Sequence, residues 1–252
     1  MAGLVGALTP SRSALCGLLA TSALAWAALF AWPASVMGRS TWGGARATLT
    51  FAMWSVMMVA MMAPTVAPTL ATFARVTRER RKRAAVASAL PAFFTSGYLL
   101  IWVAFSALAT GLQWALASGG QLTPHAALES APLQGAVLLA AGLYQLTPIK
   151  EACLRQCQSP LGFLLGHWQE GRGGALRMGL RHGFFCLGCC WALMLLMFVG
   201  GTMSLIWMVG LTAFVLLEKL ALRFPWFPRA AGAALVFAGI GVLLRGAVLA
   251  TG

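Results

Sequence analysis

The chain has 252 residues, of which 60% are hydrophobic and only 9% are charged. Eighteen Lys and Arg residues face five Glu residues and no Asp, so the formal net charge is +13. This composition excludes an ordinary soluble globular protein. The basic residues lie almost wholly between apolar runs, which is the positive-inside pattern of a multi-pass membrane protein. We therefore expect contact with membrane lipid and no nucleic-acid partner.

The apolar runs predict an all-α fold, a polytopic transmembrane helix bundle of about seven spans that forms a single integral membrane domain over residues 1–252. Its core is expected at 47–222, with a terminal span at 230–250. The first run is long for a signal peptide, and we expect it to be retained. The expected spans are Ser13–Trp32, Ala47–Thr72, Ala87–Leu116, Leu133–Thr147, Arg177–Gly201, Thr202–Leu222 and Ala230–Leu249.

The distribution of basic residues predicts the orientation of these spans. The stretch Arg75–Arg83 holds six basic residues in nine and is expected to be a cytoplasmic loop. The loop Ala117–Ala131 has no Lys or Arg and is expected outside. The segment Leu161–Arg181 mixes apolar patches with Gly and Arg, so an interfacial position is expected. The N-terminus is then cytoplasmic.

The main chemical signal is a group of three cysteines that follows a histidine. In an α-helix, His182, Cys186, Cys189 and Cys190 share one face about 100° wide. Thiolates and imidazole are ligands for copper(I), with zinc and iron as alternatives. The competing interpretation is that these cysteines are small apolar residues that pack between helices.

A second cysteine pair lies upstream. In a helix, Cys153 and Cys157 are stacked one turn apart, on the side of the membrane from which the fifth span begins. Glu218 ends the sixth span at the same predicted side. Ligands on one narrow helical face do not easily close a tetrahedral shell, so a second segment is needed. The sequence therefore predicts a metal site that combines the downstream cysteines and His182 with Cys153, Cys157 and Glu218.

The second span carries methionines at helical spacing. Met53, Met57 and Met61 recur every four residues and form one stripe. Thioethers bind copper(I), so Met57 and Met61 are candidate ligands on an approach path from the outer side. The alternative is that they fill gaps in helix packing.

Three blocks of sequence together resemble the domain of unknown function 2182 family. They are Met53-Trp54 through Met61-Met62-Ala63-Pro64 with Pro68; Tyr144-Gln145 through Thr147-Pro148 and Lys150 to Cys153 and Cys157; and Gly188-Cys189-Cys190-Trp191 through Met194, Gly201-Thr202-Met203, Trp207-Met208 and Glu218-Lys219. The similarity covers about Thr48 to Lys219. The chain departs from the family pattern at Ser204, where Asn is expected, and at Gln158, where Arg is expected.

The resemblance implies an integral membrane protein of the bacterial inner membrane that is suspected to bind metal. It also implies a protein partner of the domain of unknown function 1326 family; a homo-oligomer is the alternative. From the residues we expect soft-metal handling, with copper(I) as the first candidate, by a binding protein with no assigned catalytic residue. Two alternatives stay open. One is thiol–disulfide redox chemistry at Cys189/Cys190 and Cys153/Cys157, and the other is a non-catalytic subunit of a membrane complex.

Overall fold

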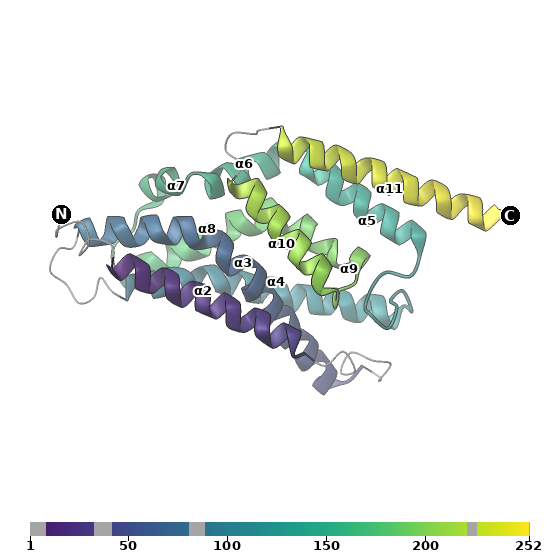
Figure 1. Cartoon of the computed structure of the whole chain (residues 1–252), viewed down its shortest axis with the longest axis horizontal. Helices are drawn as coiled ribbons and strands as arrows, with labels where there is room; N and C mark the ends of the chain where they lie inside the picture. The colour runs from purple at the N-terminus through teal and green to yellow at the C-terminus, as the bar shows by residue number, and fades with distance from the viewer. Residues whose placement is uncertain (1–8, 33–41, 81–88, 221–225, 252) are drawn as a thin grey trace.

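The computed structural model describes residues 9–32, 42–80, 89–220 and 226–251, and this part of the chain is all-α (Figure 1). The only pairing of extended backbone in it is an isolated bridge between Leu122 and Leu128. The helices are α2 (Thr9–Phe30), α3 (Gly44–Arg80), α4 (Leu90–Ser118), α5 (Ala131–Gln145), α6 (Pro148–Gln158), α7 (Pro160–His167), α8 (Gly171–Leu195), α9 (Met197–Gly200), α10 (Leu205–Leu220) and α11 (Phe227–Thr251).

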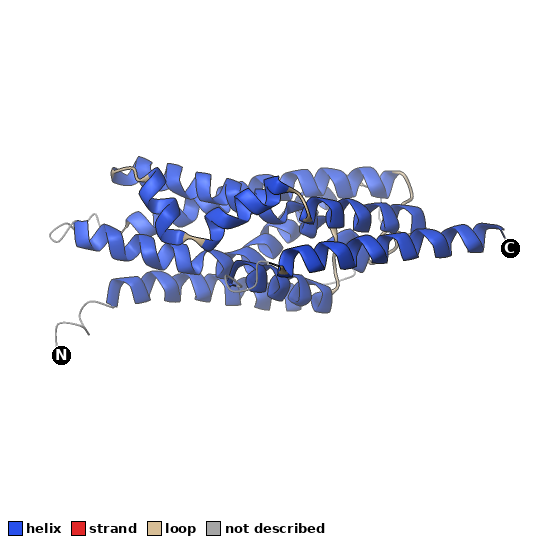
Figure 2. Cartoon of the chain, turned by 90° about the horizontal axis from the view of Figure 1, so that it is seen from above, coloured by secondary structure: helices blue, strands red, loops and turns tan. Residues whose placement is uncertain are grey.

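The helices form a bundle with two parts. Helix α2 packs on α3, α3 on α4, and α4 on α8, while α5 and α11 lie side by side as a pair (Figure 1). Most of the long helices run along one direction of the molecule (Figure 2). Glycines allow the closest approach: a Cβ atom on Gly179 of α8 would lie 2.0 Å from the backbone oxygen of Phe94 in α4. Such small residues let membrane helices pack backbone to backbone.

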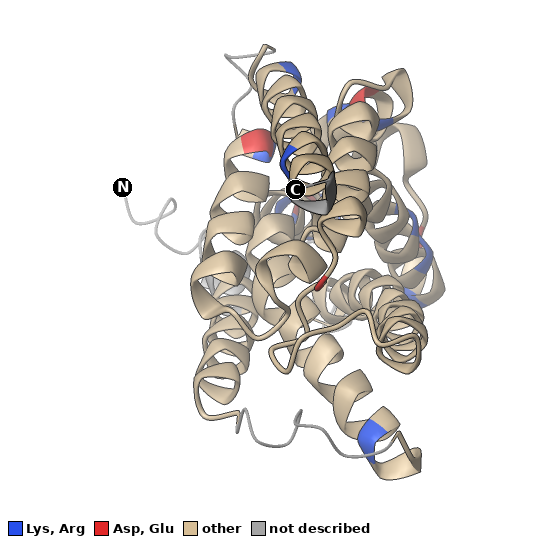
Figure 3. Cartoon of the chain, turned by 90° about the vertical axis from the view of Figure 1, so that its right-hand side faces the viewer, with Lys and Arg blue, Asp and Glu red and all other residues tan. Residues whose placement is uncertain are grey.

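Four helices in the described part of the chain are long and apolar enough to cross a membrane. They are Gly44–Arg80, Leu90–Ser118, Gly171–Gly200 and Phe227–Val248. The prediction of about seven spans was therefore wrong, although helices form in all seven regions. Helices α5 and α10 have 15 and 16 residues, or about 22–24 Å, against a hydrocarbon core of about 30 Å. The apolar part of α2, Ala14–Phe30, is also shorter. Few turns of the bundle carry a charged residue (Figure 3).

Two boundaries differ from the sequence prediction. Helix α3 continues to Arg80, so Arg75 and Arg78 belong to a helix and not to a loop; residues 81–83 of the basic stretch lie outside the described residues. Helix α8 begins at Gly171, so the second half of the segment expected at the interface belongs to a long helix. Pro160 begins α7, and no proline interrupts α8. Charged residues therefore do not end either helix, and α3 also continues through Pro64 and Pro68.

Contacts show which segments lie together at each end of the bundle. The Arg80 guanidinium lies 4.7 Å from the Trp168 ring centroid and 3.9 Å from Glu170, so the basic end of α3 meets the α7–α8 connection. At the other end, the backbone nitrogen of Leu128 donates to the backbone oxygen of Phe198 at 2.7 Å. The loop between α4 and α5 therefore lies beside α9, at the far end of α8.

This arrangement predicts the labelling pattern of single cysteines introduced at three exposed positions, Glu79, Gln169 and His125. In a Cys16→Ser background, Glu79→Cys and Gln169→Cys should resist a membrane-impermeant maleimide in intact cells, because both lie at the basic end, which the sequence predicts to be cytoplasmic. His125→Cys should be labelled, and all three should react after the membrane is opened. Labelling of Gln169→Cys from outside would reverse the orientation.

Candidate metal centre

Four buried thiols gather where α6 packs against α8: Cys157, Cys186, Cys189 and Cys190, here called the thiol cluster. The sulfur of Cys157 lies 4.0 Å from that of Cys189. The thiols of Cys189 and Cys190 donate to the backbone oxygen of Cys186 at 3.1 and 2.9 Å. The structure thus brings together both predicted cysteine groups.

The thiol cluster lies within a long helix. Cys186 is 15 residues after Gly171 and 14 before Gly200, so it is near the middle of this candidate spanning helix. The helix begins at Gly171, earlier than the sequence predicted, and carries Arg172, Arg177 and Arg181 before the cysteines.

The separation between the two sulfurs suits a shared soft metal ion. Metal–sulfur bonds of about 2.3 Å put two sulfur ligands about 3.8 Å apart at a tetrahedral angle and about 4.6 Å apart at a linear one. The 4.0 Å between Cys157 and Cys189 falls in this range. It is too long for a disulfide bond of about 2.05 Å, and all six cysteines are free. In the described residues no group of three or more His, Cys, Asp or Glu side chains is arranged to hold a metal ion. The geometry therefore suits a metal that accepts two sulfur ligands.

Helix α6 is positioned by its first turn. The hydroxyl of Thr147 accepts a hydrogen bond from the backbone nitrogen of Lys150 at 3.3 Å, and Pro148 occupies the first turn. From this start, Cys153 and Cys157 follow one and two turns further on. The pKa of the Cys157 thiol is well above its usual range because it hydrogen-bonds Cys186 and Cys189 and is buried.

Cys153 lies at the edge of the thiol cluster and is half-buried. Burial raises the pKa of its thiol. A Cβ atom on Gly188 would lie 2.7 Å from the Cys153 sulfur, so this thiol rests on the backbone of α8. Tyr144 donates a hydrogen bond to the backbone oxygen of the same glycine. Gly188 is thus the small residue that lets α5 and α6 approach α8 here.

His182 lies one turn before Cys186 and is 1% exposed. Its ring is surrounded by the rings of Phe94, Tyr98 and Phe163, with centroids 6.0, 5.9 and 4.9 Å away. Its Nδ1 atom is buried and has no hydrogen-bond partner in the part of the chain that the structure describes. The imidazole therefore borders the thiol cluster in an aromatic environment.

The sequence analysis missed the polar partners of Cys186. Lys219 of α10 places its Nζ atom 2.9 Å from the Cys186 sulfur and 2.9 Å from the hydroxyl of Thr65 in α3. The hydroxyl of Tyr98 in α4 lies 3.1 Å from the same sulfur and 3.0 Å from Thr65. Two helices thus direct polar groups at one thiol, and Thr65 of a third helix contacts both of these groups. A lysine in an apolar helix was the available signal, because ionisable residues at membrane depth usually have a specific partner.

Glu218 belongs to a different network. Both of its carboxylate oxygens lie 2.7 Å from Lys150 Nζ, and the two side chains are 2% and 0% exposed. The Gln145 side chain hydrogen-bonds both partners, and Gln158 donates to the backbone oxygen of Glu218 at 2.8 Å. The proposed ligand Glu218 therefore forms a buried ion pair that joins α6 to α10.

The methionine stripe leads along α3 to this group of side chains. Met53, Met57 and Met61 are at most 1% exposed. Thr65 is the next residue at the same four-residue spacing, and its hydroxyl contacts Lys219. Each step advances about 6 Å along the helix. The stripe therefore points toward the thiol cluster from the Gly44 end of α3.

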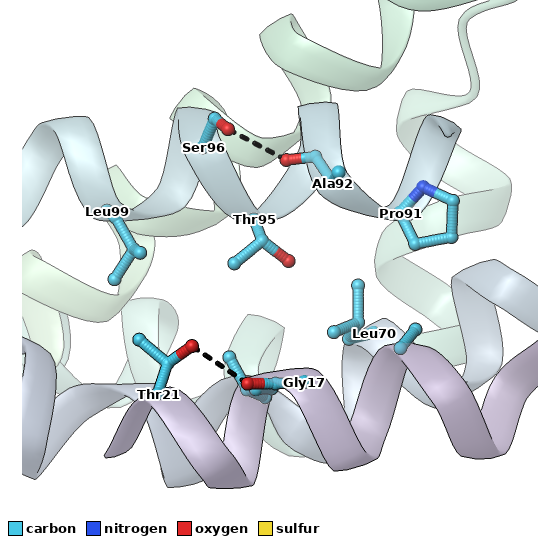
Figure 4. Close-up of a pocket in the computed structure, with 10 residues that line it drawn as sticks. Gly17, Thr21, Leu70, Pro91, Ala92, Thr95, Ser96 and Leu99 are labelled. Atoms are coloured by element: carbon cyan, nitrogen blue, oxygen red, sulfur yellow. Dashed lines mark hydrogen bonds between the residues drawn. The ribbon is translucent and has the colours of Figure 1, made fainter. Parts of the chain in front are cut away.

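A separate cavity of about 330 Å³ lies between α2, α3 and α4 (Figure 4). The hydroxyl of Thr21 donates to the backbone oxygen of Gly17 at 2.8 Å, and that of Ser96 donates to Ala92 at 2.9 Å. The hydroxyls of Thr21 and Ser96 are therefore satisfied within their own helices. No cysteine, histidine or methionine lines this cavity, and it is not part of the metal centre.

A comparison with protein families gives one match. The family model PpoB2, described as a copper chaperone and formerly the domain of unknown function 2182, matches residues 51–242. The match confirms the family resemblance seen in the sequence and covers both cysteine groups. No curated protein and no solved structure matches the chain.

The buried ion pair predicts a large loss of stability when one partner is removed. Lys150→Met should lower the free energy of unfolding by about 3–5 kcal/mol, because it leaves the Glu218 carboxylate buried without its cation. The double change Lys150→Met/Glu218→Met should recover most of this loss. Thermal unfolding in detergent measures both.

The matched control is Glu151→Gln. This glutamate is exposed, with Arg155 at 3.7 Å and Arg229 at 3.3 Å, and its replacement should change the stability by less than about 0.5 kcal/mol. A Lys150→Met protein as stable as the native one would show that the pair does not hold α6 to α10.

Proposed function

Because the chain belongs to the PpoB2 copper chaperone family, we propose that it is a membrane-embedded chaperone that carries copper(I) between two thiols of the thiol cluster. The observation that carries this proposal is the 4.0 Å distance between the sulfurs of Cys157 and Cys189. Cys186 borders this pair, because its backbone oxygen accepts a hydrogen bond from the Cys189 thiol at 3.1 Å. Copper(I) is the cargo of the protein and is not a resident cofactor.

The chemistry of the cluster favours copper(I) over zinc. Soft thiolates select copper(I), whereas zinc is almost always held by four ligands in closed sites. In the described residues no group of three or more His, Cys, Asp or Glu ligands converges. A two-sulfur site suits copper(I) better than zinc. The described residues offer too few converging ligands for iron as well.

Thiol–disulfide chemistry is the second candidate, because Cys157 and Cys189 are near enough to bond after a small movement. Two sulfurs 4.0 Å apart would have to close to about 2.05 Å. The predicted cytoplasmic end of the bundle is reducing, which opposes a stable disulfide. This second candidate function predicts that the protein in cells contains a disulfide bond between Cys157 and Cys189.

We also propose that the methionine stripe guides copper(I) to the thiol cluster. Met57 and Met61 are fully buried and precede Thr65, which contacts the Lys219 side chain beside Cys186. Thioethers bind copper(I) weakly enough to pass it to thiolates. The stripe begins toward the predicted outer end of α3, so copper would move inward along it.

Cys153 is the proposed point of transfer to a partner. Its sulfur is half-buried, in contrast to the buried thiol cluster, so an incoming thiol can reach it. A protein of the domain of unknown function 1326 family is the proposed partner, with a second copy of this chain as the alternative. The proposed location is the bacterial inner membrane with the N-terminus in the cytoplasm.

The proposal predicts that Cys157→Ser and Cys189→Ser each weaken copper(I) binding by more than about 100-fold, since changes beyond the ligands alone cost about 10- to 100-fold. Cys16→Ser is the matched control, because Cys16 is exposed and outside the cluster. Affinity is measured under anaerobic conditions by competition with a copper(I) chelator. X-ray absorption should show only sulfur in the first shell.

Unchanged copper binding in both serine variants would contradict the proposed site. A first shell of nitrogen or oxygen would contradict it as well. The thiol state of the protein in cells is measured after thiol exchange is stopped with acid. If Cys157 and Cys189 then form a disulfide and the protein does not bind copper, the redox function replaces the chaperone function.

If the stripe guides copper, removing its methionines should slow copper loading without lowering the affinity for copper. Met57→Leu/Met61→Leu nearly conserves volume, so stability should change by less than about 1.5 kcal/mol. The rate of copper(I) loading from outside should fall, while the equilibrium affinity stays the same. Met197→Leu/Met208→Leu is the control, as both residues are buried and off the stripe. Equal loading rates in the two double variants would show that the methionines of the stripe only fill space between helices.

A further inference from the structure

Lys219 holds a positive charge against the thiol cluster in the interior of the bundle. The residue is 7% exposed, and its Nζ atom lies 2.9 Å from both the Cys186 sulfur and the Thr65 hydroxyl. The backbone oxygen of Cys186 accepts a hydrogen bond from the thiol of Cys189 at 3.1 Å. The ammonium thus lies beside the thiol cluster that would hold the metal.

No carboxylate among the described residues forms an ion pair with this lysine. Its neighbour Glu218 turns both carboxylate oxygens to Lys150 at 2.7 Å. The charge of Lys219 is therefore available to the sulfur atoms. An ammonium in such an environment is costly unless a negative group compensates it.

The charge of a two-sulfur metal complex depends on the metal. Both thiols lose their protons to solvent on ligation. Two thiolates with a monovalent ion carry one negative charge, which the ammonium of Lys219 balances. Two thiolates with a divalent ion are neutral, so the ammonium stays unbalanced beside a second cation.

From this contact we propose that Lys219 is a specificity-determining residue, whose charge makes the thiol cluster select monovalent soft cations over divalent ones. The inference rests on the proposed copper site and adds the basis of its selectivity. In general, two unit charges about 5 Å apart at an effective dielectric constant of about 20 interact strongly enough to change an affinity about 100-fold. Tyr98, 3.1 Å from the Cys186 sulfur, is uncharged and cannot replace the ammonium.

The first test needs no variant. Ag(I) and Cd(II) are both soft ions that bind thiolates, and they differ in charge. For each metal, the affinity of the purified native protein is divided by that of a soluble dithiol. This relative affinity should be at least about 100-fold higher for Ag(I) than for Cd(II). Equal relative affinities would overturn the role of Lys219.

The second test compares Lys219→Gln with Lys219→Arg. Lys219→Gln should lower the affinity for Ag(I) and Cu(I) about 100-fold and leave the affinity for Cd(II) unchanged or higher. Lys219→Arg, which keeps the charge, should retain the preference for Ag(I). If Lys219→Gln weakens Ag(I) and Cd(II) binding equally, Lys219 has only a structural role.

These outcomes are distinct from a failure of the proposed function. If the native protein binds neither Ag(I) nor Cu(I), the copper site itself is wrong. If it binds both through Cys157 and Cys189 but Lys219→Gln keeps the same Ag(I)-to-Cd(II) ratio as the native protein, the copper site stands and the selectivity inference is wrong.

Discussion

The buried ion pair between Lys150 and Glu218 is the interaction on which the geometry of the metal centre depends. A carboxylate and an ammonium inside an apolar bundle are tolerated only as partners, because each alone is too costly to bury. The pair joins α6 to α10, and Gln145 at the end of α5 binds both members. Three short helices are thereby held at fixed positions around α8.

The two functional groups that approach α8 are attached directly to this pair. Cys157 follows Lys150 by seven residues, or two helical turns, on the same face of α6. Lys219 is the residue after Glu218 on α10. A single electrostatic constraint therefore positions both a sulfur ligand and the neighbouring ammonium. The long helices α3 and α4 supply the remaining contacts through Thr65 and Tyr98.

The chemistry of the cluster follows from its apolar setting. In a low-dielectric interior the interaction between a thiolate and an ammonium is stronger than in water. The buried residues Lys150, Glu218 and Lys219 each contact a polar or sulfur partner, and the sulfur atoms of the thiol cluster are buried between helices. Such a setting suits the proposed binding of a monovalent metal that needs few ligands.

The sequence by itself determined the membrane character, the all-α class, the family and the residues of the thiol cluster. Apolar runs and basic stretches are local signals, and the face shared by Cys186, Cys189 and Cys190 follows from the helical repeat alone. Even the pairing with Cys157 could be anticipated, because three ligands on one face need a second segment.

Only the tertiary structure decided which polar groups are partners. Glu218 and Lys219 are adjacent in sequence, yet successive residues on a helix point in directions about 100° apart. One therefore pairs with Lys150 and the other with Cys186. The number of candidate spans also came from the structure, because α5 and α10 are apolar but too short to span. Packing partners far apart in the chain leave no local pattern, so the sequence identified the candidate ligands while only the fold showed their contacts.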